Sequence, residues 1–195
     1  MTRDATPEDI QLFGGALCLD FANSIDWDEA GEHVAPRTDV VTSPGELQRW
    51  AARLGLPPVA TAGARELRET RALRDALHRL FSAIAAGETV ASDDLARLQR
   101  SAVAATRAGR LAPHDGAWRL TWPAEEPAAV RFEVALDAIR LLDDDQRLAR
   151  VTRCPGRHCG WLFLNTSGRR RWCSMTACGS REKMRRMYER RRAAR

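Results

Sequence analysis

The 195-residue chain lacks long apolar runs, and no stretch approaches the ~18 apolar residues that a membrane-spanning helix needs. Its opening segment, MTRDATPEDIQ, contains acidic side chains and no apolar stretch, so no signal peptide is recognisable. We therefore expect a cytoplasmic protein that does not enter a membrane. Apolar residues still make up 44% of the chain, which permits a buried core and argues against global disorder.

The motifs of common enzyme classes are also missing. The sequence has no glycine-rich phosphate-binding loop. Its four histidines are scattered along the chain, at His33, His78, His114 and His158. Because no catalytic constellation is visible, we do not expect an enzyme.

Lysine is almost absent: of the 31 lysine and arginine residues, only Lys183 is a lysine. Such a preference for arginine can reflect a GC-rich genome and says little about ligands. The distribution of charge says more. Residues 1–150 carry 18 Arg and 24 Asp or Glu, whereas residues 151–195 carry 13 Lys or Arg and 2 Glu. This asymmetry predicts an acidic body and a basic segment that attracts polyanions; a disordered basic tail is the alternative.

Helical periodicity dominates the first 145 residues. Ser43, Pro44 and Glu46 form the pattern of a capping box at the start of a helix that Gly55 ends. The alternation of Trp118, Leu120 and Trp122 predicts one short, half-buried strand. Three further segments repeat apolar residues at helical spacing, and we expect these to face the core: Leu73, Leu77, Leu80, Phe81 and Ile84; Leu95, Leu98 and Val103; and Phe132, Leu136, Ile139 and Leu142.

The acidic run DDDQ at 143–146 marks the end of this helical part. We predict a mainly α protein with a small β component, with a helical N-terminal domain at 1–147 and a C-terminal module at 148–195. Because no Gly- or Ser-rich linker follows the acidic run, we expect the two parts to dock.

Four of the five cysteines fall within 25 residues, as C-x4-C, thirteen residues, then C-x4-C. Without a secretion signal, paired cysteines indicate a metal site rather than disulfides. Four thiolates fill the tetrahedral shell of Zn²⁺, so we expect one structural zinc ion. The expected ligands are Cys154, Cys159, Cys173 and Cys178. Unliganded buried or redox-active thiols are the alternative, and His158 is a candidate to replace one sulfur. Cys18 stands alone among apolar residues and is interpreted as buried.

The residues around the cysteines predict a treble-clef-like finger: a knuckle, a β-hairpin and a basic helix. WLFLN is expected to be one strand, TSGR the turn and RRRW the returning strand. Trp161 and Trp172 either stack on unpaired bases or fill a small core. Loss of the metal, through Cys173→Ser, is expected to melt residues 154–195 and to spare the helical domain.

The basic residues of this module are the candidate contacts to nucleic acid. Met184, Met187 and Tyr188 form a narrow apolar stripe that we expect to lie on the hairpin, leaving the cations free; a solvated face against the acidic body is the alternative. The candidates are Arg169, Arg170, Arg171, Arg181, Lys183, Arg185, Arg186, Arg190 and Arg192.

In the N-terminal part, Asp20, Asn23 and Arg71 are candidates for a small-molecule pocket. Asp20 and Asn23 stand among apolar neighbours in ALCLDFANS, where polar groups need partners. The alternative is that they cap a helix or fix the N-terminal segment.

The stretch WCSMTACGSREKMRR resembles the CGNR zinc-finger family, with CGSR at 178–181 and Ser180 in place of Asn. RCPGRHCGWLFLNTSGRRRWCS matches the first half of that finger. The segments GGALCLDFANSIDW, SPGELQRWAARLGL and RELRETRALRDALHRLF resemble the ABATE-type domain that commonly precedes it. The resemblance implies a stress-induced transcription regulator whose front domain senses a small molecule and whose finger binds nucleic acid.

The main hypothesis is therefore a DNA-binding regulator with a possible homodimeric state. An RNA-binding module is the second hypothesis, because basic hairpins with aromatic residues also suit single strands. An enzyme with its active site in the N-terminal domain is the third.

Overall fold

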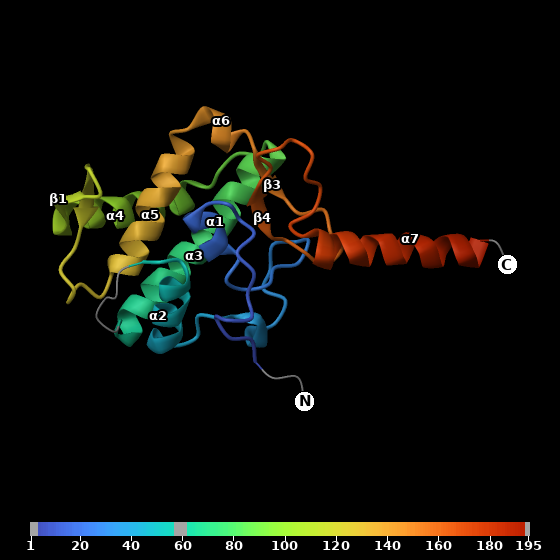
Figure 1. Cartoon of the computed structure of the whole chain (residues 1–195), viewed down its shortest axis with the longest axis horizontal. Coiled ribbons are helices and arrows are strands. Elements are labelled where there is room, and N and C mark those ends of the chain that lie inside the picture. The colour runs from blue at the N-terminus through green and yellow to red at the C-terminus, as the bar shows by residue number, and fades with distance from the viewer. Residues whose placement is uncertain (1–3, 57–61, 194–195) are drawn as a thin grey trace.

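The computed structural model describes residues 4–56 and 62–193. It consists of a helical body and one long C-terminal helix that projects away from it (Figure 1). The body contains α1 (Leu17–Ala22), the 3₁₀ turn η1 (Pro36–Thr38), α2 (Pro44–Arg53), α3 (Ala64–Ala86), α4 (Ser92–Ala108), α5 (Ala129–Leu142) and α6 (Asp145–Leu148). The strands are β1 (Arg110–His114), β2 (Ala117–Thr121), β3 (Val151–Arg153) and β4 (Leu162–Leu164), and the chain ends with the π-helical turn η2 (Met175–Gly179) and α7 (Ser180–Ala193). The predicted fold class, mainly α with a small β component and a terminal finger, is confirmed.

The predicted start of α2 is confirmed in detail. The Ser43 side chain accepts a hydrogen bond from the Glu46 backbone N–H, and the Glu46 carboxylate accepts one from the Ser43 N–H. Pro44 occupies the first helical position, where its missing N–H costs nothing. Gly55, just after the helix, has φ of +68°, which glycine adopts without steric strain.

The long helix α3 forms the centre of the main core. Leu73, Leu77, Leu80 and Phe81 are buried as predicted. Helix α1 packs beside α3 and is almost entirely buried. On the other side, the Trp50 ring of α2 meets the Phe21 ring of α1 edge-on, with centroids 4.8 Å apart. The body is thus arranged around the buried helix α1 and the buried face of α3.

The predicted faces of two helices are partly wrong. In α4, Leu98 is buried, but Leu95 is 43% and Val103 is 51% exposed. The buried face of α4 instead uses Asp94, Ser101 and Ala105, which lie at helical spacing with Leu98. Small and polar residues carry this interface because α4 packs closely between α3 and α5.

A similar shift occurs in α5. Ile139 is 39% exposed, whereas Val134, Ala138 and Leu141 are buried. Phe132 is buried as predicted, in a separate small cluster with Ala105 and Ala128.

Strand β2 pairs with β1 in an antiparallel hairpin, with Pro113 opposite Trp118. The small sheet is therefore present, but Trp118 is 71% exposed rather than half-buried. The hairpin extends beyond the helices at the far end of the body (Figure 1), so the outer residues of its apolar face have no covering layer.

Strands β3 and β4 pair antiparallel, with Val151 opposite Leu164, and pack on α3. Val151, Leu162 and Leu164 belong to the same buried cluster as the helices of the body. The C-terminal module is therefore built partly on the body's own core. None of the described helices combines the length and apolarity that crossing a membrane requires.

Candidate metal centre and nucleic-acid interface

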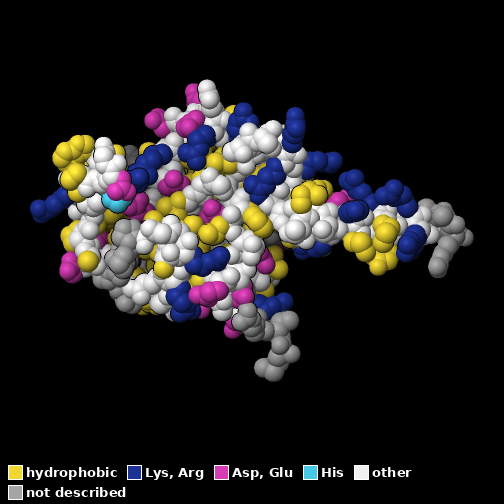
Figure 2. All heavy atoms as spheres, in the orientation of Figure 1, with side chains coloured by type: hydrophobic (Ala, Val, Ile, Leu, Met, Phe, Trp, Pro, Cys, Tyr) yellow, Lys and Arg dark blue, Asp and Glu magenta, His cyan; other side chains and the backbone are white. Residues whose placement is uncertain are grey.

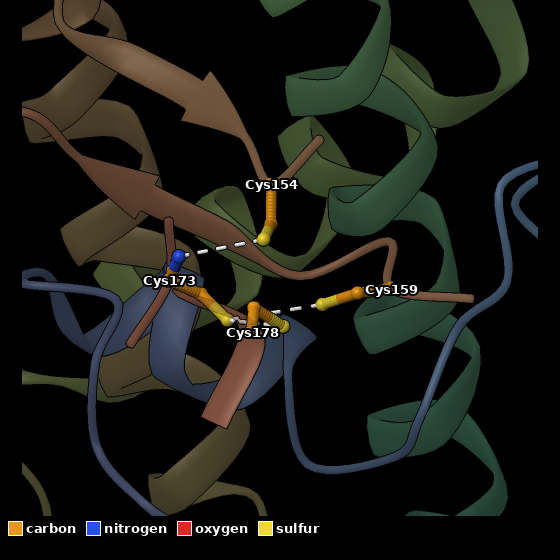
Figure 3. A group of neighbouring side chains, drawn as sticks. All are labelled: Cys154, Cys159, Cys173 and Cys178. Carbon is orange, nitrogen blue, oxygen red and sulfur yellow. Dashed lines mark hydrogen bonds between the residues drawn. The ribbon is translucent and has the colours of Figure 1, made fainter. Parts of the chain in front are cut away.

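The four predicted ligands converge from two places in the fold. Cys154 follows β3 and Cys159 lies shortly before β4, so the first pair forms the tip of this hairpin. Cys173 lies shortly before η2 and Cys178 lies within it, directly before α7. All four sulfur atoms lie within 4.8 Å of one another and all four side chains are buried (Figure 3).

The spacing of the sulfurs fits a tetrahedral zinc ion. Sγ of Cys173 lies 3.8 Å from Sγ of Cys159 and 3.5 Å from Sγ of Cys178. A disulfide requires ~2.05 Å, whereas Zn–S bonds of ~2.3 Å place tetrahedral sulfurs ~3.8 Å apart. The cysteines therefore form one structural zinc site. Zinc in a closed shell of four thiolates contributes folding energy and leaves no position for a reacting water.

Two glycines permit the tight knuckle around the first pair. A Cβ at Gly156 would lie 3.0 Å from the Cys178 sulfur, and one at Gly160 would lie 2.6 Å from the Asp28 carbonyl oxygen. His158 has φ of +57°, its side chain is 71% exposed, and it pairs with Glu29. It therefore does not replace a cysteine in the cluster.

The thiols of the cluster share hydrogen bonds with one another. Hydrogen bonds from Cys159, and then from Cys173, lower the pKa of the Cys154 thiol, and the same contacts with Cys154 raise the pKa of the Cys159 and Cys173 thiols. The Cys173 backbone N–H also donates to the Cys154 sulfur, at 3.4 Å. From α7, the Arg181 guanidinium donates to the Cys178 sulfur, at 3.2 Å. These donors compensate the negative charge that a four-thiolate zinc site carries.

The predicted returning strand is wrong. Residues 169–172 form no strand, because β4 pairs with β3. Arg170 determines the path of this segment instead. Its guanidinium donates to the carbonyl oxygens of Phe13, Trp172 and Cys173 and lies 4.3 Å from the centroid of the Phe163 ring.

Trp161 and Trp172 pack against the cysteine cluster, as the small-core interpretation predicts.

The candidate cations divide into those with partners within the protein and those without a carboxylate partner. Arg170 and Arg181 are engaged within the finger, as described above. Arg185 pairs with Glu182, at 2.7 Å, and with Glu189. Arg186 also pairs with Glu182, at 2.7 Å. Within the described part of the chain, the remaining candidates are exposed and form no ion pair, namely Arg169, Arg171, Lys183, Arg190 and Arg192.

The prediction that the apolar stripe of α7 lies on the hairpin is wrong. Met184 is 45% and Tyr188 is 58% exposed. Both faces of strand β4 are already covered, because Leu162 and Leu164 pack in the core of the body and Phe163 packs in the cysteine cluster. Helix α7 consequently projects from the finger without lying on the body (Figure 1).

Asp20, Asn23 and Arg71 each bond to a different partner within the protein, and the small-molecule pocket expected around them stays a prediction. The Asp20 carboxylate accepts from the Gly14 N–H, at 2.7 Å, so it fixes the N-terminal segment. Asn23 binds both backbone groups of Leu162. Arg71 pairs with Asp39, at 2.8 Å.

A buried polar group that the sequence interpretation missed lies on α3. Arg74 is completely buried and pairs with Asp39, at 2.7 Å, and His78 is 1% exposed. Thr70, Arg74 and His78 are four residues apart, and all are buried with the apolar face of α3. The sequence could have revealed this buried group, because polar residues recur at every fourth position within the apolar face of α3.

Asn23 links the body to the finger, and its removal should be costly. It is fully buried; its Nδ2 donates to the Leu162 carbonyl, at 2.8 Å, and its Oδ1 accepts from the Leu162 N–H, at 2.9 Å. Asn23→Ala leaves both backbone groups buried and unpaired, so we expect a loss of about 2–4 kcal/mol in urea unfolding. Asn165→Ala, which removes a partly exposed bond to the Arg170 N–H, is the control and should cost less than about 1 kcal/mol. Equal effects would contradict the linking role.

Asp20 should make stability depend on pH. Burial raises its pKa to about 6, although hydrogen bonds from Gly14 and Gly15 act in the opposite direction. Between pH ~4 and ~6, Asp20 is protonated in the native chain but ionised in the unfolded chain. Above this window the buried, ionised carboxylate lowers the free energy of unfolding. This loss of stability disappears as the pH falls towards 4. Asp20→Asn keeps an acceptor for Gly14, and we expect it to be more stable than wild type by up to about 3 kcal/mol at pH 7. Urea titrations of both proteins should show this difference shrinking towards pH 4; a less stable variant at pH 7 would refute it.

Comparison with known protein families identifies two regions. Residues 15–145 match the ABATE family, described as "Putative stress-induced transcription regulator". Residues 150–191 match the CGNR zinc finger. A search among curated proteins gives no match. Neither matched description is that of an enzyme.

Proposed function

We propose, from the premise that this chain belongs to the ABATE family of transcription regulators and ends in a CGNR zinc finger, that it binds double-stranded DNA through α7 and the zinc-stabilised finger. In this proposal the helical body senses a small molecule and the finger carries the contacts to DNA. The proposal also places the protein in the cytoplasm and puts the boundary between its two domains between residues 147 and 148.

The projection of α7 is the observation that carries the DNA-binding proposal. Its sequence, SREKMRRMYERRRA, holds seven basic and two acidic side chains. Figure 2 shows Lys and Arg side chains gathered along this helix, away from the body. At ~1.5 Å per residue, fourteen residues span ~21 Å, and the DNA major groove admits such a helix.

The placement of the tryptophans favours duplex DNA over single-stranded RNA. Readers of single strands stack bases on exposed aromatic side chains. Trp161 and Trp172 are instead partly buried against the cysteine cluster, and the Trp161 indole N–H donates to the Asp26 carboxylate, at 3.1 Å. Both rings are thus committed to packing the finger.

Duplex binding by an arginine-rich helix should be strongly dependent on salt. A protein that neutralises several phosphates releases as many counterions, with a slope of about −0.9 per phosphate in log K against log salt. We expect a slope near −5 for the zinc-loaded chain on random duplex DNA, measured by fluorescence anisotropy. A salt-independent interaction, or tighter binding to single-stranded RNA of equal length, would refute the proposal.

A further inference from the structure

A cleft of about 440 Å³ lies between the body and the finger, separate from the zinc site. One wall runs from His78, in the C-terminal half of α3, to Glu88, just after the helix. The facing wall comes from residues 30–32 and from Thr152 and Arg153 of β3. Because α3 belongs to the body and β3 leads directly to the zinc ligand Cys154, an occupant of this cleft would touch both parts of the protein.

His78 forms the inner end of this cleft, because it lines the cleft although the residue is only 1% exposed. Its Nε2 atom lies 2.8 Å from the Gly160 carbonyl oxygen. A carbonyl only accepts hydrogen bonds, so Nε2 is the donor and Nδ1 of the neutral ring is left as an acceptor. Within the described residues, neither His78 Nδ1 nor Ser82 Oγ, one helical turn further along α3, finds a hydrogen-bond partner. The cleft thus contains two buried polar atoms that a ligand could satisfy.

The imidazole ring is fixed in its orientation. Trp27 stacks on it, with centroids 3.8 Å apart and planes 5° from parallel, and the bond to Gly160 holds one edge. A Cβ at Gly31 of the facing wall would lie 4.0 Å from Cε1, the ring atom next to Nδ1. The edge that carries the unpaired acceptor therefore faces the opposite wall of the cleft.

The inner end suits a neutral donor rather than a charged group. Burial lowers the pKa of His78 to about 3, although the hydrogen bond to Gly160 acts in the opposite direction, and the charges of Arg153 and Arg79 lower it further. The same burial and the same guanidinium charges oppose a ligand cation at this point. A carboxylate brings only acceptors, whereas Nδ1 has no proton to donate. The group that fits is a neutral O–H or N–H.

The outer part of the cleft offers donors and acceptors of balanced charge. Glu32 and Glu88 supply two carboxylates, and Arg79 and Arg153 supply two guanidinium groups. Arg79 uses Nε and one terminal nitrogen for Asp94, and Arg153 uses one terminal nitrogen for two backbone carbonyl oxygens. Across the described residues, the other terminal nitrogen of each guanidinium takes part in no hydrogen bond. Such a lining favours a neutral ligand whose groups both donate and accept, as hydroxyl groups do.

The rest of the lining is small and apolar. Ala83, Ala85 and Ala86 supply methyl groups along α3 between the polar positions. The C–H groups of a small ligand can lie against such a surface while its hydroxyl groups reach the polar side chains. The volume of the cleft is within the ~300–1,000 Å³ that is usual for small-molecule sites.

We propose that this cleft binds a neutral sugar of monosaccharide size, with one hydroxyl group donating to His78 Nδ1 and accepting from Ser82 Oγ. Further hydroxyl groups donate to the carboxylate of Glu88 and accept from Arg153. This assignment deepens the sensing part of the proposed function and rests on it. The ligand would bear on the finger directly, since His78 bonds to Gly160, beside the zinc site.

The test is a ligand-observed NMR titration of the zinc-loaded full chain with D-glucose and with D-ribose. D-Glucuronate and D-glucosamine, which add a negative and a positive charge to the glucose ring, serve as matched probes. We expect saturable binding of a neutral sugar and binding at least tenfold weaker for both charged probes. Ser82→Ala should weaken sugar binding about fivefold and Glu88→Ala about tenfold, as expected for the loss of a neutral and of a charge-assisted hydrogen bond. Glu125→Ala, which removes an exposed carboxylate outside the cleft, should leave the affinity unchanged.

Absence of binding by both neutral sugars, in protein that holds one zinc per chain, would overturn the inference. So would equal or tighter binding of either charged probe, or unchanged affinity in both cleft variants. The titration contains no DNA, so its outcome is independent of the DNA-binding proposal. Sugar binding without any duplex binding would remove only the DNA-binding proposal, and the reverse result would remove only the ligand assignment.

Discussion

Cys173→Ser is expected to release the zinc ion and to unfold the finger. Three thiolates and a hydroxyl form a much weaker zinc site. The binding of a structural zinc ion contributes about 10 kcal/mol or more to a small module of this kind. The cysteine cluster outside the main core contains little else besides Phe163 and the edges of two tryptophans, so no other interaction replaces the metal. Metal analysis should fall from one zinc per chain to none, and circular dichroism should lose the signal of α7.

The structure changes the expected effect on the body. The sequence suggested that the helical domain would be spared. However, Val151, Leu162 and Leu164 of the finger belong to the body's own core, and Asn23 would lose its partner Leu162. Exposing three such side chains costs about 5 kcal/mol, so we expect the helices of the body to melt at a lower temperature as well.

Cys18→Ser is the control for this experiment. Cys18 is fully buried outside the cluster, and burial raises the pKa of its thiol, so it should not act as a ligand. This variant should keep one zinc per chain even where its core is weakened. Retention of one zinc in Cys173→Ser would show that the ligand set is wrong.

The metal site could be predicted from the sequence because its geometry is mostly local. Each C-x4-C pair is placed by a single turn, and residue type alone identifies thiolates as zinc ligands. The start and end of α2 were predictable for the same reason, since the Ser43–Glu46 box depends on four consecutive positions.

The errors arise where the partner is distant in the chain. Strand β4 pairs with β3 rather than with residues 169–172. The sequence of β4 does not indicate which of these two segments it pairs with. The face of α4 depends on how closely α3 and α5 approach, so Ser101 and Ala105 are buried while Val103 is not. Asn23 was recognised as a polar group needing a partner, but that partner, Leu162, lies 139 residues away and becomes a neighbour only in the folded chain.

Reversal of charge on α7 tests the other central proposal. Arg185→Glu with Arg186→Glu should lower duplex affinity by about a hundredfold or more and reduce the salt slope by about two, one for each lost phosphate contact. Both arginines now pair with Glu182, and their hydrogen bonds lower its pKa. Binding to DNA must therefore exchange these carboxylate contacts for phosphate contacts.

The double reversal also places four carboxylates on neighbouring turns, which can weaken the helix itself. Arg185→Gln with Arg186→Gln avoids this, and should show the same loss in slope with normal helix content by circular dichroism. Arg65→Glu with Arg68→Glu makes the same change in net charge on exposed positions of α3. If that body variant weakens DNA binding as much as the α7 reversal, net charge rather than α7 governs the interaction, and the helix is not the contact surface.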